Sequence, residues 1–478
     1  MASRPAHPEL GPEGNPLLEV LAPFSPMSEL PKLLQHEPLK NIPWRALKPE
    51  DREIYLREVE HHYWPVEPQL DVCADIQLMI RAGLAARNPL SKDEQRRIAM
   101  LALAPDAHGL RLQSLRTRAG GAVVAAITGM GKSTLVERAL SVFAPEQIIV
   151  HGQSKSCGWS TLTQVTYLIV DAPPNATRHG FFEAIIGALD RLLGTDYSSV
   201  LRRQRNIDAA LVYMAKTLSI HRVGLLIIDE NQGDSLARNQ WGSEFILIFL
   251  GLMNLGIPVV LMGNPLAFTE LGQGAQLTRR FASNGWHELL PATDSKAKWW
   301  RQQFAVGLTR FSLCESSLQA HVVVDASFGY DRGIPGLASA LWLEANRIAL
   351  RRGGEAAIMG VEDVDMAARS PRFRKLADIA KSVSEGNTNG RYTDLPITPS
   401  SSEQTSGQST KSAPSPEDAA KARDKLAAAL KSKQSRRNSK SDKDAALNRT
   451  LTEDDLRRGT DAMSILAKTQ SEQGEMNV

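Results

Sequence analysis

One stretch in the first half of the chain strongly limits what it can fold into: a short apolar run, a glycine-containing loop and then a helical pattern. The apolar run is Ala122–Ile127, and the loop leads into Gly131, Lys132 and Ser133. Small residues let backbone N–H groups curl around a phosphate at a helix N-terminus, whose partial positive charge favours anions. The sequence therefore predicts a strand–loop–helix unit that binds a nucleotide phosphate.

The positions of this loop have separate expected roles. Lys132 would reach the β- and γ-phosphates, and Ser133 would bind Mg²⁺. The first glycine of the usual GxxxxGK[ST] pattern is Ala126 here. Alanine disfavours positive φ, so a slightly altered start of the loop is expected. The predicted nucleotide-binding residues of the loop are Thr128, Gly129, Met130, Gly131, Lys132, Ser133 and Thr134.

A second apolar run ends in two carboxylates. Val223–Ile228 is followed directly by Asp229 and Glu230. Burial of the strand in a sheet leaves Asp229 at its carboxyl end, where it can support the Mg²⁺ shell. Glu230 is the predicted general base that polarises the attacking water. Together with the loop, this pair predicts ATP and Mg²⁺ as cofactors and ATP hydrolysis as the reaction.

Polar residues that follow the next run complete the predicted catalytic set. Asn264 comes after Val259–Met262 and would align water near the γ-phosphate; the alternative is a simple turn residue. Arg279 and Arg280 form a pair, and a guanidinium can stabilise transition-state charge in a neighbouring subunit's site. The alternatives for these two arginines are a structural role and a DNA contact.

Five apolar runs alternate with helical stretches between residues 121 and 263, which predicts an α/β fold with a parallel sheet flanked by helices. The runs are Ala122–Ile127, Gln147–Val150, Gln164–Val170, Val223–Ile228 and Val259–Met262. We expect a flexible arm over 1–40, a helical region over 41–110, the α/β core over 111–291, a helical lid over 292–385 and a disordered tail over 386–478. The tail has no aromatic residue after Tyr392, and short helices are expected to begin at Ser415 and Thr452.

Composition excludes some classes and leaves others open. Lys and Arg total 56 against 53 Asp and Glu, and this balance neither requires nor forbids nucleic acid. The three cysteines lie far apart, which argues against a disulfide framework or a Cys-rich zinc site and favours the cytoplasm. Phe245–Gly263 is nearly long enough to cross a bilayer, but Gly256 and Pro258 interrupt it. A helix ending near Leu255 and then a strand are expected, with no membrane contact.

The order of these motifs resembles the AAA+ ATPases and, more narrowly, the TnsC/TniB family of transposition regulators, over roughly 42–379. Three positions depart from that family: Asn264 stands where Thr is usual, Ala126 replaces Gly, and Ala172 stands where Cys is expected. The segments that carry the resemblance are Arg87–Pro89, Gln164–Pro173, Phe181–Phe182, Leu192–Tyr197, Ile228–Gln232, Gly256–Gly263 and Arg279–Phe281.

The resemblance implies a helical lid that carries a sensor-2 arginine, and Arg332 occupies the matching place within Tyr330–Gly336. It also implies a homo-oligomer that assembles on double-stranded DNA with ATP. Such an oligomer connects a target-selection protein of the TniQ/TnsD type to the transposase subunits. ATP hydrolysis would then drive its disassembly.

The residues that contact DNA do not follow from the resemblance. Lys155 lies in a polar loop, His151–Cys157, where its ammonium and nearby backbone amides would bind phosphates with little regard to sequence. The alternative is a plain surface connection. Two other functions remain open here: a helicase-loader-type replication ATPase and a nucleotide-switch signalling ATPase. The tail carries no recognisable effector domain, which counts against the second.

Overall fold

The structure is a computed structural model that describes residues 14–104, 119–173, 177–204, 206–231, 242–268, 275–387, 392 and 395. Within these ranges the side chains of 230, 231, 242–247 and 275–277 are not described. The described residues all belong to one unit, residues 1–400. The two helices expected at Ser415 and Thr452 lie outside the described residues, and so do residues 1–13 of the N-terminal arm.

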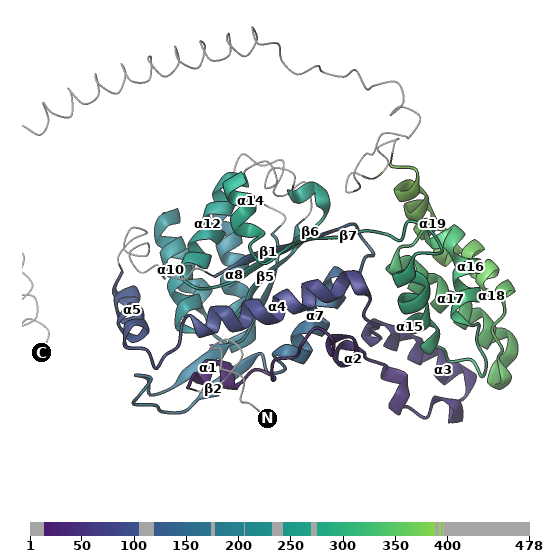
Figure 1. Cartoon of the computed structure of the whole chain (residues 1–478), viewed down its shortest axis with the longest axis horizontal. Coiled ribbons are helices and arrows are strands. Elements are labelled where there is room, and N and C mark those ends of the chain that lie inside the picture. Colours follow the sequence, from purple (N-terminus) through teal and green to yellow (C-terminus); the bar gives the residue numbers. More distant parts are fainter. Residues whose placement is uncertain are drawn as a thin grey trace, which may run out of the picture. The chain divides into compact units, whose positions relative to one another are not determined.

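The core is a five-stranded sheet in the order β4-β5-β6-β1-β7, with all neighbouring strands parallel (Figure 1). The predicted parallel sheet is therefore confirmed. The edge strand β7 was not predicted, because its four residues include Trp286, His287 and Glu288 and form no apolar run. The strands are β1 Gly121–Ala126, β4 Leu168–Asp171, β5 Leu226–Asn231, β6 Val259–Gly263 and β7 Trp286–Leu289.

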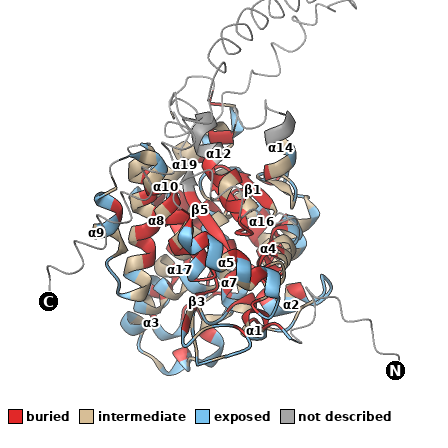
Figure 2. Ribbon diagram, turned by 90° about the vertical axis from the view of Figure 1, so that its left-hand side faces the viewer, coloured by how far each residue is buried: buried red, intermediate tan, exposed pale blue. Residues whose placement is uncertain are grey.

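Helices cover both faces of the sheet because the side chains of each strand alternate between two apolar cores. Val123 and Ala125 of β1 pack into the core shared with α8, α10 and α12, whereas Val124 packs into the core shared with α4 and α7. Buried residues follow the strands and the inner sides of these helices (Figure 2). The helices are α4 Glu67–Ala85, α7 Lys132–Phe143, α8 Arg178–Leu193, α10 Ile207–Ile220 and α12 Gly242–Asn254.

Two predicted strands have different bounds in the structure. The run Gln164–Val170 is two strands in two sheets: β3 (Leu162–Val165) pairs antiparallel with β2 (Ile148–His151), and β4 pairs with β5. Between the two strands, the hydroxyl of Thr166 donates to the Glu146 carbonyl at 2.8 Å. The second difference is that β5 begins at Leu226 and includes the two carboxylates, since its pairing with β4 extends to Asp229.

The apolar segment Phe245–Gly263 is not one continuous helix. It forms α12, then a turn at Gly256 with φ of 85°, and then β6, which agrees with the prediction. Among the helices that the structure describes, none combines the length and the apolarity needed to cross a membrane.

Residues after β7 form a helical region with its own apolar core, in which Trp300, Phe311 and Trp342 are buried. Its helices are the π-helix η5 (Trp300–Phe304), α15 Ala305–Arg310, α16 Ala320–Asp331, α17 Pro335–Gly353, α18 Val361–Arg369 and α19 Pro371–Ser384. The N-terminal helix α3 (Pro49–Tyr55) joins this region, because Glu53 accepts hydrogen bonds from Arg347 at 3.1 Å and Arg351 at 2.6 Å.

Short helices complete the described chain. They are α1 Pro16–Glu19, α2 Leu30–Leu34, α5 Lys92–Leu103, α9 Tyr197–Arg202 and α14 Ala275–Phe281, with the 3-10 helices η1 Pro38–Asn41, η2 Trp44–Ala46, η3 Leu56–His61, η4 Pro265–Phe268 and η6 Gly354–Ala356.

Candidate nucleotide site

The loop between β1 and α7 forms one wall of a cavity of about 670 Å³. Gly129 and Gly131 have φ of 82° and 80°, in the left-handed region that glycine adopts without strain. Ala126, in contrast, ends β1 and is not among the residues with positive φ, so alanine fits at that position. The cavity is lined by every predicted loop residue, Thr128, Gly129, Met130, Gly131, Lys132, Ser133 and Thr134.

The charged residue of the loop, Lys132, lies at the N-terminus of α7. Its Nζ donates to the carbonyl oxygens of Ala126 at 3.0 Å and Ile127 at 3.4 Å. The ammonium is therefore held beside the backbone N–H groups of the loop. Both the helix N-terminus and the ammonium favour an anion at this end of the cavity.

The carboxylate predicted to support Mg²⁺ meets the loop directly. Asp229 is 7% exposed, lines the cavity and accepts a hydrogen bond from Ser133 Oγ at 2.6 Å on Oδ2. A carboxylate and a hydroxyl are hard oxygen ligands of the kind that Mg²⁺ takes beside nucleotide phosphates. The residues present therefore fit a Mg²⁺–nucleotide complex. Glu230 follows in β5, but its side chain lies outside the described residues.

Asn264 lies at the carboxyl end of β6 and also lines the cavity. Its Oδ1 accepts a hydrogen bond from the Leu266 backbone N–H at 3.0 Å, which fixes the side chain at the start of η4. The turn role and the site role that the sequence left open are thus compatible, because the amide that caps the turn also borders the cavity.

The lid contributes backbone to the site at a point that the sequence did not single out. The Gly336 N–H, in the first turn of α17, donates to the Gly129 carbonyl at 2.7 Å. A Cβ at Gly336 would lie 2.9 Å from that same oxygen, so only glycine allows this approach. Pro335, Gly336 and Ser339 line the cavity. The usable sequence signal was the Pro-Gly pair at a predicted helix start.

The rest of the cavity is lined mostly by apolar residues from two distant segments, together with Glu60 and His62. Trp64 packs on Gly307 of α15 so closely that a Cβ there would lie 2.2 Å from the Trp64 Cβ. Next to it, His62 makes a 2.9 Å hydrogen bond through Nε2 with the Gly307 carbonyl, and burial lowers the His62 pKa. Further lining comes from Val59, Val66, Phe304 and Leu308. An aromatic and aliphatic end suits a nucleobase.

The remaining predicted residues lie away from the cavity lining. Arg279 is exposed on α14, and Arg280 donates from NH2 to Asn254 Oδ1 at 2.7 Å. Arg332 is exposed at the end of α16, with φ of 53°. Lys155 is exposed in the loop after β2. None of the four is among the described residues that line the cavity.

Residues 115–271 match the family model of the AAA domain. The core has the AAA+ P-loop fold. With a phosphate-binding loop and a carboxylate-tipped strand meeting at one cavity, the protein is an ATPase. No match was found among curated protein sequences.

Similar solved structures include the Aeropyrum pernix ORC1 protein in complex with DNA, at 18% identity and a TM-score of 0.35, covering 64% of this chain and 72% of that one. Drosophila ORC bound to DNA has 16% identity and a TM-score of 0.34, covering 73% of this chain and 84% of that one. The Aeropyrum pernix ORC2 protein in ADPNP–ADP complexes has 14% identity and a TM-score of 0.36, covering 66% and 84%. Because these scores are low, what this chain does is inferred from its own residues.

Proposed function

We propose that this AAA+ ATPase is a cytoplasmic, DNA-binding regulator of DNA transposition. It assembles as a homo-oligomer on double-stranded DNA and connects a TniQ/TnsD-like target-selection protein to the transposase subunits. The transposition role rests on the TnsC/TniB resemblance of the sequence. The observation that carries the oligomer is the position of Arg279, which is exposed and lies outside the cavity of its own chain.

In this proposal the catalytic roles belong to groups at the cavity wall and to Glu230. Lys132 binds the β- and γ-phosphates, and Ser133 and Asp229 hold Mg²⁺, which when bound neutralises charge on the phosphate oxygens. Glu230 takes the proton of the attacking water as general base. Asn264 orients that water near the γ-phosphate, because its side chain borders the cavity at the end of β6.

The arginine that acts across subunits is Arg279 in this proposal. Its neighbour Arg280 is engaged with Asn254 of its own chain, whereas Arg279 is exposed on the surface of α14. A guanidinium supplied by a second subunit would stabilise charge on the transferred phosphoryl group. Arg332 is the proposed sensor-2 arginine of the lid and does not line the cavity of its own chain.

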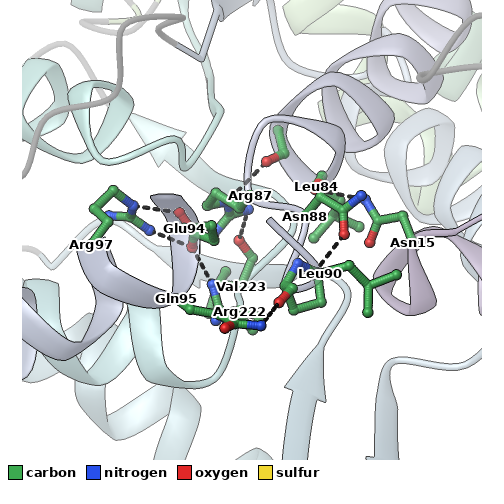
Figure 3. A network of polar contacts seen from close by, with 12 residues as sticks. Asn15, Leu84, Arg87, Asn88, Leu90, Glu94, Gln95, Arg97, Arg222 and Val223 are labelled. Carbon is green, nitrogen blue, oxygen red and sulfur yellow. Dashed lines mark hydrogen bonds and ion pairs between the residues drawn. The ribbon is translucent and has the colours of Figure 1, made fainter. Parts of the chain in front are cut away.

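DNA contact is assigned to the loop that carries Lys155. Beside this loop lies the arginine network, which we define as Arg87, Arg97, Arg222 and Glu94 (Figure 3). Three buried guanidiniums against one carboxylate give a positive potential on that side of the core. Gln95, next to Glu94, donates to the Ser156 carbonyl at 2.5 Å, so the network and the loop are contiguous. Phosphates would be favoured there without base recognition.

The test compares assembly on random-sequence duplex DNA with a non-hydrolysable ATP analogue and with ADP, by mobility shift and negative-stain microscopy. Rings or filaments are expected only with the ATP analogue. Glu230→Gln should bind ATP, hydrolyse it at least about a hundredfold more slowly and leave stable oligomers on DNA. Binding of the oligomer to purified transposase then tests the transposition role.

Three results would count against the proposal. Normal turnover by Glu230→Gln would remove this residue from the base role. If Arg279→Ala hydrolysed ATP at the wild-type rate and Arg280→Ala did not, the trans-acting role would belong to Arg280. Tight ATP binding without any DNA binding, in either nucleotide state, would exclude the DNA platform and favour a nucleotide-switch ATPase.

A further inference from the structure

The side-chain amide of Gln69 points a donor into the nucleotide cavity. Gln69 lies in the first turn of α4, is 8% exposed and lines the cavity. Its Oε1 accepts a hydrogen bond from the Tyr63 hydroxyl at 2.8 Å. Within the part of the chain that the structure describes, Nε2 has no hydrogen-bond partner. This amide donor therefore stands at the cavity wall, available to an acceptor on a bound ligand.

The orientation of this amide is fixed by Tyr63, which is itself fixed. The Tyr63 backbone exchanges hydrogen bonds with His36, at 2.9 Å from Tyr63 N–H and 2.8 Å from His36 N–H. Burial raises the pKa of the Tyr63 phenol well above its usual range, so its hydroxyl stays protonated and can donate. Because the hydroxyl donates to Oε1, the planar amide presents Nε2 on its other side.

The position of Nε2 along the cavity indicates which part of a nucleotide it would meet. Nε2 lies 3.8 Å from the point that a Cβ on Gly131 would occupy, so it borders the phosphate-binding loop. The apolar end, lined by Trp64 and Leu308, suits the base, and Gln69 bonds Tyr63, the sequence neighbour of Trp64. In a nucleotide the ribose joins the phosphates to the base, so the ribose is the part that passes between these two ends.

We propose that Gln69 is a nucleotide-binding residue that donates its Nε2–H to a ribose hydroxyl of the bound nucleotide. This inference rests on ATP occupying the cavity as described above. Tyr63 is the positioning residue, because its hydroxyl donates to the Gln69 amide and fixes which side carries Nε2. The pair makes the site selective for ribonucleotides over the deoxynucleotide that lacks the accepting hydroxyl.

The test measures dissociation constants by isothermal titration calorimetry for ATP, 2′-deoxy-ATP and 3′-deoxy-ATP. Wild-type protein is expected to bind one of the two deoxy analogues about fivefold more weakly than ATP. Gln69→Leu is expected to bind ATP about fivefold more weakly and to lose its discrimination against that analogue. Tyr63→Phe is expected to bind ATP with an affinity between those of wild type and Gln69→Leu, because the Gln69 amide is then free to rotate.

A matched control separates this effect from damage to the helix. Gln77 lies on the same helix, is 3% exposed, and bonds the backbone of Ser25 at 2.9 Å through both amide atoms. Gln77→Leu should lower thermal stability and leave the ratio of ATP to deoxy-ATP affinities unchanged.

Two results would overturn the inference. The first is that Gln69→Leu binds ATP as tightly as wild type does. The second is that it loses affinity for ATP and for both analogues by the same factor, since the acceptor would then not be a ribose hydroxyl. If wild-type protein bound no ATP at all, the proposed ATPase function would fail and the inference with it. In the first two cases ATP binding by the wild type stands, so the two failures are distinguishable.

Discussion

The nucleotide cavity and the arginine network contain similar charged groups in different surroundings. In the cavity, Lys132 and Asp229 stand at the wall of a space of about 670 Å³. In the network, Arg87 is fully buried and donates to the carbonyls of Gly83 at 2.9 Å and Val223 at 2.8 Å. Charges at a cavity wall are available to a ligand, whereas enclosed charges must find partners within the chain.

Glu94 is the carboxylate on which the arginine network depends. It is 3% exposed, accepts two hydrogen bonds from Arg97 at 2.6 and 2.8 Å, and also bonds Arg222 (Figure 3). Burial lowers the pKa of the Arg87 and Arg222 guanidiniums, and Glu94 opposes that effect. The network therefore joins the end of α4 to the segment just before β5, and its buried positive charges depend on the Glu94 carboxylate.

The largest expected effect is that of Glu94→Gln. Removing this carboxylate leaves three buried guanidiniums, which should lower the free energy of unfolding by about 3–5 kcal/mol in urea denaturation. The control is Glu385→Gln, whose partner Lys381 lies 3.8 Å away and which is 57% exposed. That change should cost less than about 1 kcal/mol. Equal stability of the two variants would mean that the network is neutralised by another group.

Lys132→Ala tests the nucleotide cavity. Its ammonium contacts two carbonyl oxygens at the cavity wall, so the free energy of unfolding should change by less than about 1 kcal/mol. ATP affinity should fall by roughly tenfold to a hundredfold, because a charged hydrogen bond to phosphate is lost. Calorimetric titration and denaturation of the same sample measure both. A loss of stability as large as that of Glu94→Gln would contradict the distinction between charges at a cavity wall and charges enclosed in the core.

Gly336→Ala acts where the lid meets the phosphate-binding loop. The added methyl would lie 2.9 Å from the Gly129 oxygen, so the first turn of α17 must shift, at a cost of about 1–3 kcal/mol. ATP affinity should fall with it. Gly329→Ala on α16 is the control: nothing lies within 4 Å of its added Cβ, and it should stabilise by about 0.5–1 kcal/mol. Unchanged melting temperature and ATP binding in Gly336→Ala would show that the lid contact is dispensable.

Asp331 belongs neither to the nucleotide cavity nor to the arginine network. It is a buried carboxyl with no ion-pair partner in the described part of the chain. Burial raises its pKa from 3.8 to about 6, against the hydrogen bonds from Gly333 N–H and Ser327. A raised folded pKa means that its contribution to stability is present below the unfolded value of 3.8 and is lost as pH rises through about 6.

Asp331→Asn removes that titration. The unfolding free energy of the wild type should fall relative to that of the variant as pH rises from about 4 to 6, by at most about 1.4 kcal/mol per pH unit. Denaturation series at several pH values measure it. A difference that does not vary with pH would mean that the hydrogen bonds keep the carboxyl ionised throughout.

Much of the phosphate end of the site was predictable from the sequence. The loop Thr128–Thr134 and Asp229 were found because their spacing is local and each sits at the end of an apolar run. The apolar end was not predictable: Trp64 and Gly307 lie in separate stretches far apart in the chain, and no local pattern shows that the two come into contact. The split of Gln164–Val170 into β3 and β4 was also missed, since a single apolar run does not reveal that its halves pair with different strands.

The parallel α/β core, the phosphate-binding loop and the carboxylate that faces it could all be predicted from the amino-acid sequence, because runs of apolar residues and the positions of glycines are local properties of the chain. Tertiary structure alone decided which residues close the cavity. Gln69, Trp64 and Gly336 line one cavity with the loop only after α4, the lid and the sheet have packed together. It also decided which arginines are internal and which face solvent, since a guanidinium's partners depend on what surrounds it and not on its neighbours in the chain.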